Sequence, residues 1–180
     1  MFTIRRATHA DIDGIAHVHV DTWRTAYAGI MPEDKLSNLS YERSAKQWEQ
    51  NLKSTQSYTS VADHNKVVGF VSCGPERNQV SQYDCEIYAL YVLATYQGRG
   101  IGRQLVVSAA RELQDRGFET MLIWVLEDNT SARRFYERLG GELIKERLYY
   151  AIGDVRLAEV GYGYSLDQLL TMSTTRSHDS

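Results

Sequence analysis

The sequence predicts an α/β fold: one mixed, six- to seven-stranded sheet flanked by about four helices. Segments with the alternating or continuous apolar pattern of strands are separated by segments with the 3.6-residue period of amphipathic helices. Residues 121–126 are continuously apolar, as expected of a central strand that is covered on both faces. The length of 180 residues suits a single domain, and the chain contains neither an internal repeat nor an evident domain boundary.

The N-terminal part predicts one strand and two helices. Residues 2–7 alternate weakly, which favours a strand. Thr8 and Asp11 resemble a capping box, and apolar residues at helical spacing follow them. A break near Pro32, with a turn or a short helix, separates this helix from a second one that Ser40 can cap.

An extended pattern then replaces the helical one. Residues 58–62 and 67–73 predict two strands joined by a hairpin turn, because both are rich in residues that favour strands. A polar loop is expected at residues 74–83, and residues 85–92 predict the fourth strand.

Helices and strands alternate in the next part of the chain. Residues 100–116 predict a helix that Gly117 ends, and the central strand at 121–126 follows it. Asn129 can cap a short helix that stops at Gly140.

Two strands and a tail complete the chain. Residues 143–151 and 155–164 predict a final strand pair joined by a tight turn. Residues 1–170 are then the single domain, and the polar residues 171–180 are expected to form a disordered tail.

Composition excludes several classes of function. The net charge is −3 and no long basic run is present, so we expect no nucleic-acid partner. No apolar stretch approaches the roughly 20 residues that span a bilayer, and the N-terminus lacks a signal-peptide pattern. Cys73 and Cys85 have neither metal-ligand nor redox spacing, so we expect reduced thiols, no bound metal and a cytoplasmic protein without a membrane partner.

Residues 90–103 carry the strongest functional signal, a strand that runs into a glycine-rich turn and opens a helix. The free N–H groups at such a helix start favour a phosphate, to which Arg99 and Arg103 can add charge. A dinucleotide-binding fingerprint would need a third glycine at position 103, which is arginine. A Walker loop is excluded because no Gly-Lys-Ser/Thr follows.

Two motifs together resemble the GCN5-related N-acetyltransferases, the GNAT family. Gln97-x-x-Gly100-x-Gly102 resembles the acyl-CoA-binding motif of that family, and the order of predicted elements from residue 2 to 170 also matches. The family's Asn-x-x-Ala-x-x-Phe-Tyr-x-x-x-Gly pattern on the next helix is matched by Asn129, Ala132, Phe135, Tyr136, Leu139 and Gly140. The chain departs from the family at Gly141, where Gly-Phe is usual.

The resemblance implies acetyl-CoA as cosubstrate and a sheet that splays between its fourth and fifth strands. The pantetheine arm would lie in this gap, and the diphosphate would bind the glycine-rich turn. The residues implied in coenzyme binding are Leu90, Tyr91, Val92, Gln97, Gly98, Arg99, Gly100, Ile101, Gly102, Arg103, Asn129, Ala132 and Tyr136.

The resemblance also implies two proton-transfer residues. Tyr136 stands at the family's position for the acid that protonates the coenzyme sulfur, although it can also serve only to pack against the coenzyme. Glu86 is the predicted general base, on the same strand face as Leu90 if the strand alternates regularly. Glu86 can alternatively serve only to attract a cationic substrate.

The acceptor is expected to be a primary amine of a small molecule, such as a polyamine, an aminoglycoside-like amine or an amino-acid derivative. Trp23, Tyr27 and Tyr88 are the predicted acceptor-binding residues, with Glu33 or Asp34 attracting a cation. Trp23 can equally belong to the core. The alternatives are a protein N-terminal or lysine acetyltransferase, a non-catalytic CoA-binding module, and a longer acyl donor. Members of the family often form homodimers, and the sequence does not decide whether this protein does.

Overall fold

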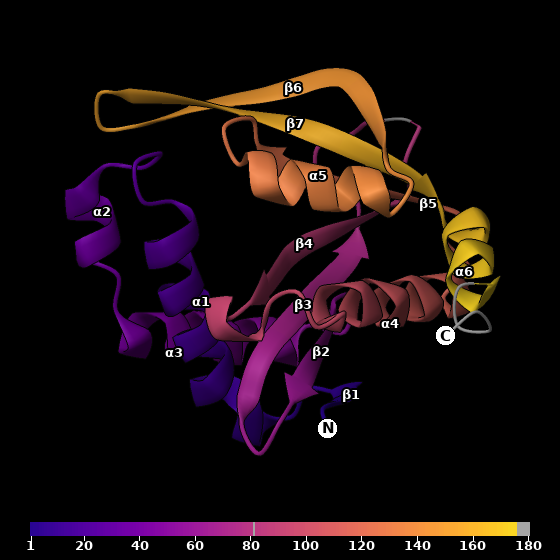
Figure 1. The fold of residues 1–180 in the computed structure, drawn as a ribbon, viewed down its shortest axis with the longest axis horizontal. Coiled ribbons are helices and arrows are strands. Elements are labelled where there is room, and N and C mark those ends of the chain that lie inside the picture. Colours follow the sequence, from indigo (N-terminus) through magenta and orange to yellow (C-terminus); the bar gives the residue numbers. More distant parts are fainter. Residues whose placement is uncertain (81, 176–180) are drawn as a thin grey trace.

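The computed structural model describes residues 1–80 and 82–175 and confirms the predicted α/β class with a seven-stranded mixed sheet (Figure 1). The strand order is β1-β2-β3-β4-β5-β7-β6, in which only β4 and β5 pair in parallel. The strands are β1 (Thr3–Arg6), β2 (Tyr58–Asp63), β3 (Val67–Pro75), β4 (Cys85–Val92), β5 (Thr120–Leu126), β6 (Glu142–Ile152) and β7 (Val155–Ser165).

Helices cover both faces of the sheet. They are α1 (Ile12–Ala26), α2 (Glu33–Ser37), α3 (Tyr41–Lys53), α4 (Ile101–Asp115), α5 (Thr130–Arg138) and α6 (Leu166–Thr175), with short 3-10 turns η1 (His9–Asp11) and η2 (Ala94–Tyr96). One apolar cluster joins α4, α5 and α6 to one face, and two smaller clusters join α1, α2 and α3 to the other. We call these the α4 face and the α1 face. No helix of the described residues is long and apolar enough to cross a membrane.

The predicted helix caps are present. The Ser40 hydroxyl accepts the N–H of Arg43 at 3.3 Å. The Asn129 side chain accepts the N–H of Ala132 at 3.2 Å. Gly117 takes a φ of +88° after α4, a left-handed conformation that favours glycine.

Helix α6 was not predicted, and it corrects the expected tail. It runs from Leu166 to Thr175, so regular structure continues past residue 170, while residues 176–180 lie outside the described part of the chain. Leu166 and Leu169 are buried in the α4-face cluster, at a spacing of three residues. A spacing of three residues is typical of a helix, but two apolar residues at that spacing are too little evidence to predict a helix in an otherwise polar tail.

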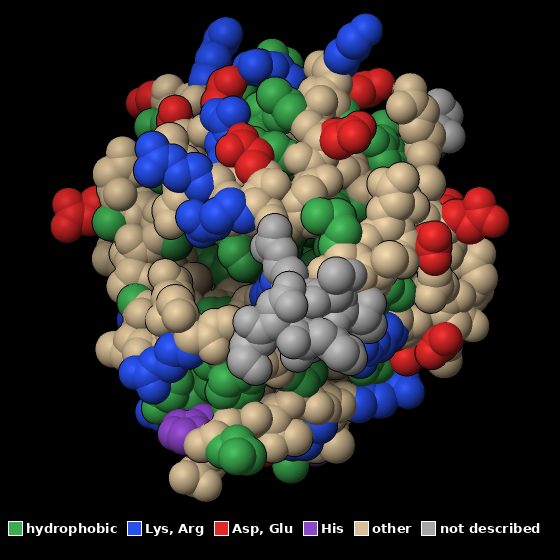
Figure 2. All heavy atoms as spheres, turned by 45° about the vertical axis from the view of Figure 1, so that its right-hand side comes forward, with side chains coloured by type: hydrophobic (Ala, Val, Ile, Leu, Met, Phe, Trp, Pro, Cys, Tyr) green, Lys and Arg blue, Asp and Glu red, His purple; other side chains and the backbone are tan. Residues whose placement is uncertain are grey.

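Charged side chains of both signs are interspersed on the face of the molecule that Figure 2 shows. This distribution matches the small net charge of −3.

The β4 strand contains an irregularity that overturns one prediction. Its register against β3 shifts between Ser72 and Cys73, so Tyr88 is an extra residue in β4. Cys85 and Ile87 pack on the α4 face before the bulge, and Leu90 packs on that same face after it. Glu86 and Leu90 therefore lie on opposite faces, whereas regular alternation placed them together.

The predicted splay between β4 and β5 is present. The two strands pair at only three positions, the last joining Ile87 to Ile123. Beyond that point β4 stays paired with β3 as far as Val92, and β5 stays paired with β7 as far as Leu126. A gap therefore opens in the middle of the sheet, and the backbone groups of β4 that face it have no strand partner there.

An ion-pair network ties the first strand to the sheet and gives a stability prediction. Arg5 donates to both carboxylate oxygens of Asp11, at 2.7 and 2.8 Å, and to Asp63 at 2.8 Å. Asp11 is only 6% exposed, so Arg5→Ala leaves a buried carboxylate without its main partner. We expect thermal or urea unfolding at pH 7 to show a loss of about 1–3 kcal/mol.

Arg5 holds the pKa of Asp11 below its ordinary value, so the stabilisation is present at neutral pH and is lost as the pH falls through that lowered pKa. The difference between the two proteins should therefore shrink in acid. Arg111→Ala is the control, because Arg111 is exposed on α4 and forms no ion pair among the described residues. Equal stability of the Arg5→Ala and Arg111→Ala proteins would contradict the assignment.

Candidate active site

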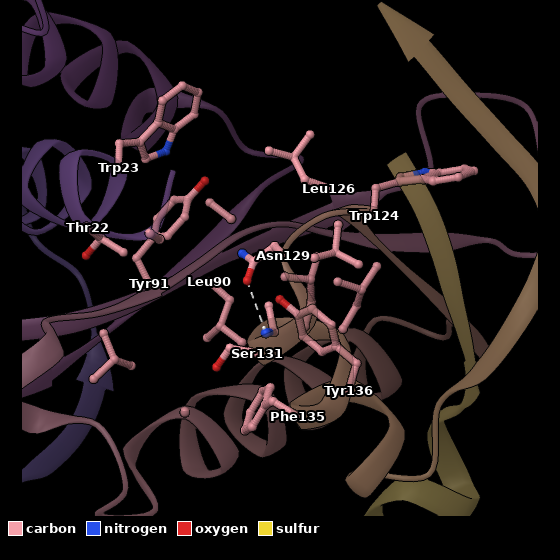
Figure 3. Close-up of a pocket in the computed structure, with 18 of the residues that line it drawn as sticks. Thr22, Trp23, Leu90, Tyr91, Trp124, Leu126, Asn129, Ser131, Phe135 and Tyr136 are labelled. Atoms are coloured by element: carbon pink, nitrogen blue, oxygen red, sulfur yellow. Dashed lines mark hydrogen bonds between the residues drawn. The ribbon is translucent and has the colours of Figure 1, made fainter. Parts of the chain in front are cut away.

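A cavity of about 920 Å³ occupies the gap between β4 and β5, and its lining residues come from both faces of the sheet. Its walls come from α1, β4, α4, β5, α5 and the β6–β7 hairpin. Figure 3 shows Trp23 and Tyr91 on one side of the cavity and Phe135 and Tyr136 on the other, with Leu90 between them. Side chains alternate along β4, so Leu90 and Tyr91 lie on opposite sides of the gap, and the bulge at Tyr88 decides which residue lies on which side.

The start of α4 forms an anion site at one end of the cavity. Gly98 and Gly100 have φ of +73° and +79°, and a Cβ at either would meet no atom within 4 Å. The N–H of Gln104 makes the first bond within the helix, to the carbonyl of Gly100 at 3.1 Å. The N–H groups of Ile101, Gly102 and Arg103 precede it, so they are free to bind an anion at the positive end of the helix dipole.

The side chains around this turn have different positions. Ile101 is buried in the α4-face cluster, so only its backbone can contact a ligand. Gln97 lines the cavity and donates to the carbonyl of Val92 at 3.0 Å, which fixes the turn against β4. Arg103 also lines the cavity, whereas Arg99 lies outside it over the ring of Tyr96. Neither arginine forms an ion pair in the part of the chain that the structure describes.

Gly102 brings α4 and α5 together. A Cβ there would lie 3.2 Å from the ring of Phe135, so a larger residue would separate the two helix starts. Asn129 and Ala132, joined by the cap bond of α5, line the cavity beside this contact.

Tyr136 closes the cavity opposite Leu90. It is 7% exposed, and its ring packs on Phe135 with centroids 5.4 Å apart. Burial raises the pKa of Tyr136, so its hydroxyl keeps its proton at neutral pH and can donate it. The Tyr164 hydroxyl donates to the Tyr136 carbonyl at 2.9 Å. It lies where a side chain at Gly141 would be, so this position, where the chain departs from the family pattern, has room only for glycine.

Aromatic residues form the wall on the α1 face. Trp23 and Tyr27, the predicted acceptor-binding residues, meet edge to face at 5.0 Å, and both line the cavity. The Trp23 indole N–H is buried without a hydrogen-bond partner among the described residues. Tyr91 lies on this face too, stacked on His19 at 5.6 Å. Its side chain therefore lies with Trp23 and Tyr27, and only its backbone faces the gap from the α4 side.

Glu86 lines the cavity but is fully engaged by a neighbour. It is 2% exposed, and Arg77 donates to one carboxylate oxygen at 2.7 Å and to the other through its backbone N–H and Nε at 3.2 and 3.3 Å. The Arg77 guanidinium also lies 3.9 Å above the ring centre of Tyr88. The Tyr88 hydroxyl donates to the carbonyl of Pro75 at 2.6 Å, so Tyr88 presents its ring to this corner.

Neither cysteine is poised as a nucleophile. Cys73 and Cys85 are free and buried. Burial raises the pKa of Cys73 to about 12 and also raises that of Cys85, so both are thiols at neutral pH.

Among the charged residues that line the cavity, the sequence did not single out Arg77, Arg138 and Glu159. Glu159 stands on β7, far in sequence from the motifs, and only the strand pairing brings it to the gap. Glu33 and Asp34, expected to attract a cation, are exposed on α2 and do not line the cavity.

Comparisons with known proteins agree with this geometry. Residues 19–141 match the family model described as the acetyltransferase (GNAT) family. An uncharacterized N-acetyltransferase from Bacillus subtilis (strain 168), YuaI, is 40% identical over 91% of this chain and 93% of its own.

Two solved structures share the fold. One is PaiA N-acetyltransferase from Thermoplasma acidophilum in complex with coenzyme A, with a TM-score of 0.68 and 19% identity over 88% of this chain and 98% of that one. The other is ribosomal-protein-alanine N-acetyltransferase from Brucella melitensis, with a TM-score of 0.71 and 22% identity over 91% of this chain and 99% of that one.

The family match spans α4, α5 and the gap between β4 and β5, and the Bacillus relative covers nearly the whole chain. The protein therefore belongs to the GNAT family and is an N-acetyltransferase whose cosubstrate is acetyl-CoA.

Proposed function

We propose that the protein acetylates a primary amine of a small cationic molecule, by direct attack on acetyl-CoA in a ternary complex. The observation that carries this proposal is a single cavity in the gap between β4 and β5 whose lining residues come from both faces of the sheet. The coenzyme enters from the α4 face and the acceptor from the α1 face, so they meet in the gap and no acetyl-enzyme is needed.

The α4 face supplies the coenzyme site in this proposal. The N–H groups from Gly98 to Arg103 bind the diphosphate, with Arg103 adding charge. The pantetheine arm lies along β4 from Leu90 to Val92, where backbone groups facing the gap lack a strand partner. An N–H of this stretch stabilises the oxyanion that forms when the amine attacks the thioester.

Tyr136 is the proposed acid. Its hydroxyl is protonated and faces the cavity opposite Leu90, where the thioester would lie (Figure 3). When the carbon–sulfur bond breaks, this hydroxyl protonates the departing sulfur and regains a proton from the nitrogen that has attacked.

The α1 face supports a small, cationic acceptor. Trp23, Tyr27, Tyr88 and Tyr91 provide aromatic faces, which bind cations and alkyl chains. Two carboxylates, Glu86 and Glu159, stand here against one guanidinium, that of Arg77, which leaves a net negative charge. Because this charge favours ammonium groups, we expect polyamines and aminoglycoside-like amines to bind better than neutral amines.

A protein N-terminus is the second candidate, favoured by the fold likeness to the ribosomal-protein-alanine enzyme. Free buried thiols support a reducing, cytoplasmic setting for either acceptor.

A panel of acceptors with thiol detection tests the proposal. We expect coenzyme A release from acetyl-CoA to be fastest with diamines and polyamines, and their kcat/KM to exceed that of matched monoamines about tenfold or more, since one added charge contact is worth about 1–2 kcal/mol. A peptide series beginning with alanine serves as the comparison. Faster turnover of the peptides would reverse the order of the two candidates. Acetyl-CoA binding without turnover of any amine would favour a non-catalytic module.

A further inference from the structure

We infer that Glu159 of β7, rather than Glu86, accepts the proton that the acceptor's ammonium group must lose. The inference rests on the proposed function and names a residue for its first step.

Strand pairing places Glu159 at the open end of the gap. It stands opposite Leu126 of β5 on one side and Leu148 of β6 on the other, and all three residues line the cavity. Leu157, two residues earlier on β7, packs in the cluster with Met31 on the α1 face. Because side chains alternate along a strand, Glu159 points to this same face, from which the acceptor enters.

The two cavity carboxylates differ in what already binds them. Glu86 receives hydrogen bonds on both oxygens from Arg77, and it is almost completely buried. Glu159 is half-buried and forms no ion pair among the described residues. Its hydrogen bond is a long one, 3.4 Å from the Tyr150 hydroxyl. An incoming ammonium group can therefore reach Glu159 without displacing an arginine.

The groups around Glu159 favour its role as a base. Burial is the largest effect on its carboxyl and raises its pKa, and the negative charge of Glu86 also raises it. The Tyr150 hydrogen bond and the positive charge of Arg77 lower it, and the net result is a raised pKa. Tyr91 also interacts with Glu159, and it is neutral because burial raises its pKa. A raised pKa makes the Glu159 carboxylate a stronger base toward the ammonium group.

The protons balance in this scheme. The ammonium group gives one proton to Glu159, directly or through a water, and Glu159 later releases it to solvent. The neutral nitrogen forms a bond to the acetyl carbon, and the carbon–sulfur bond breaks. The second nitrogen proton replaces the one that Tyr136 has given to sulfur, so the products are an amide, coenzyme A thiol and one proton.

Glu159→Gln tests the assignment. It is assayed with the fastest amine of the panel and with an analogue of that amine that carries fluorine beside the nitrogen. The fluorine lowers the amine's pKa, so the analogue is already neutral at the assay pH and needs no base. We expect kcat to fall about a hundredfold with the ordinary amine and to stay near the wild-type value with the neutral analogue. In the wild type, kcat with the ordinary amine should fall as the pH drops through the raised pKa of Glu159, and this dependence should disappear in the variant.

Two further variants complete the experiment. Glu146→Gln makes the same chemical change at an exposed position of the hairpin away from the cavity, and it should change neither amine's kcat. Glu86→Gln should keep the acid dependence of the wild type. Loss of that dependence in Glu86→Gln with its retention in Glu159→Gln would overturn the inference, as would a rise in KM without a change in kcat. Failure of the wild type to acetylate any amine would instead refute the proposed function.

Discussion

Replacing Gly100 by aspartate is expected to weaken acetyl-CoA binding about a thousandfold. Gly100 caps α4, and a side chain there would point into open space beside the first-turn N–H groups. A carboxylate would occupy the place of the diphosphate and repel it, which costs about 4 kcal/mol for each pair of charges about 4 Å apart near a protein surface. That energy corresponds to about a thousandfold in affinity, which calorimetry with acetyl-CoA can measure.

The other end of the same helix offers a matched control. Gly117 follows α4 with a φ of +88°, and a Cβ there would also meet no atom within 4 Å. Gly117→Asp therefore causes similar backbone strain, about 1–2 kcal/mol, far from the cavity. Both variants should lose similar stability, and only Gly100→Asp should lose coenzyme affinity. Unchanged affinity in folded Gly100→Asp protein would place the diphosphate elsewhere.

Removing the hydroxyl of Tyr136 is expected to lower kcat about a hundredfold and to leave the affinity for acetyl-CoA within about twofold, because general-acid groups contribute at least this much when they act alone. The ring of Tyr136→Phe keeps its packing on Phe135, so the cavity wall remains. Steady-state kinetics with the best amine and calorimetry with acetyl-CoA separate the two effects.

Tyr162 provides the comparison for this variant. It is buried next to Tyr136, with ring centroids 6.1 Å apart, but its hydroxyl is bound to Arg133 and Glu137 and does not line the cavity. Tyr162→Phe should lower stability by about 1 kcal/mol and leave kcat unchanged. A Tyr136→Phe enzyme as fast as Tyr162→Phe would mean that Tyr136 only packs against the coenzyme.

The coenzyme half of the site could be predicted because its signals are local. Gly98 and Gly100 adopt a backbone that glycine favours, and Asn129 caps the helix that carries Tyr136. Each feature depends on residues a few positions apart, and the same holds for the bounds of the other helices and strands except α6.

The acceptor half depends on pairing between distant strands, which a single sequence does not specify. Glu159 reaches the gap only because β7 pairs with β5, and Arg77 binds Glu86 only because the loop after β3 folds back. The bulge at Tyr88 moved Leu90 to the other face and invalidated a prediction based on strict alternation. Bulges have no reliable signature in one sequence, and they commonly occur beside active sites.

A structure of the protein with bound acetyl-CoA would test the central claim most directly. We expect the diphosphate within hydrogen-bonding distance of the N–H groups between Gly98 and Arg103, and the thioester in the gap between Leu90 and Tyr136, with the acetyl group directed toward the α1 face. A coenzyme bound outside the gap, or with its acetyl group directed away from Trp23 and Glu159, would contradict it.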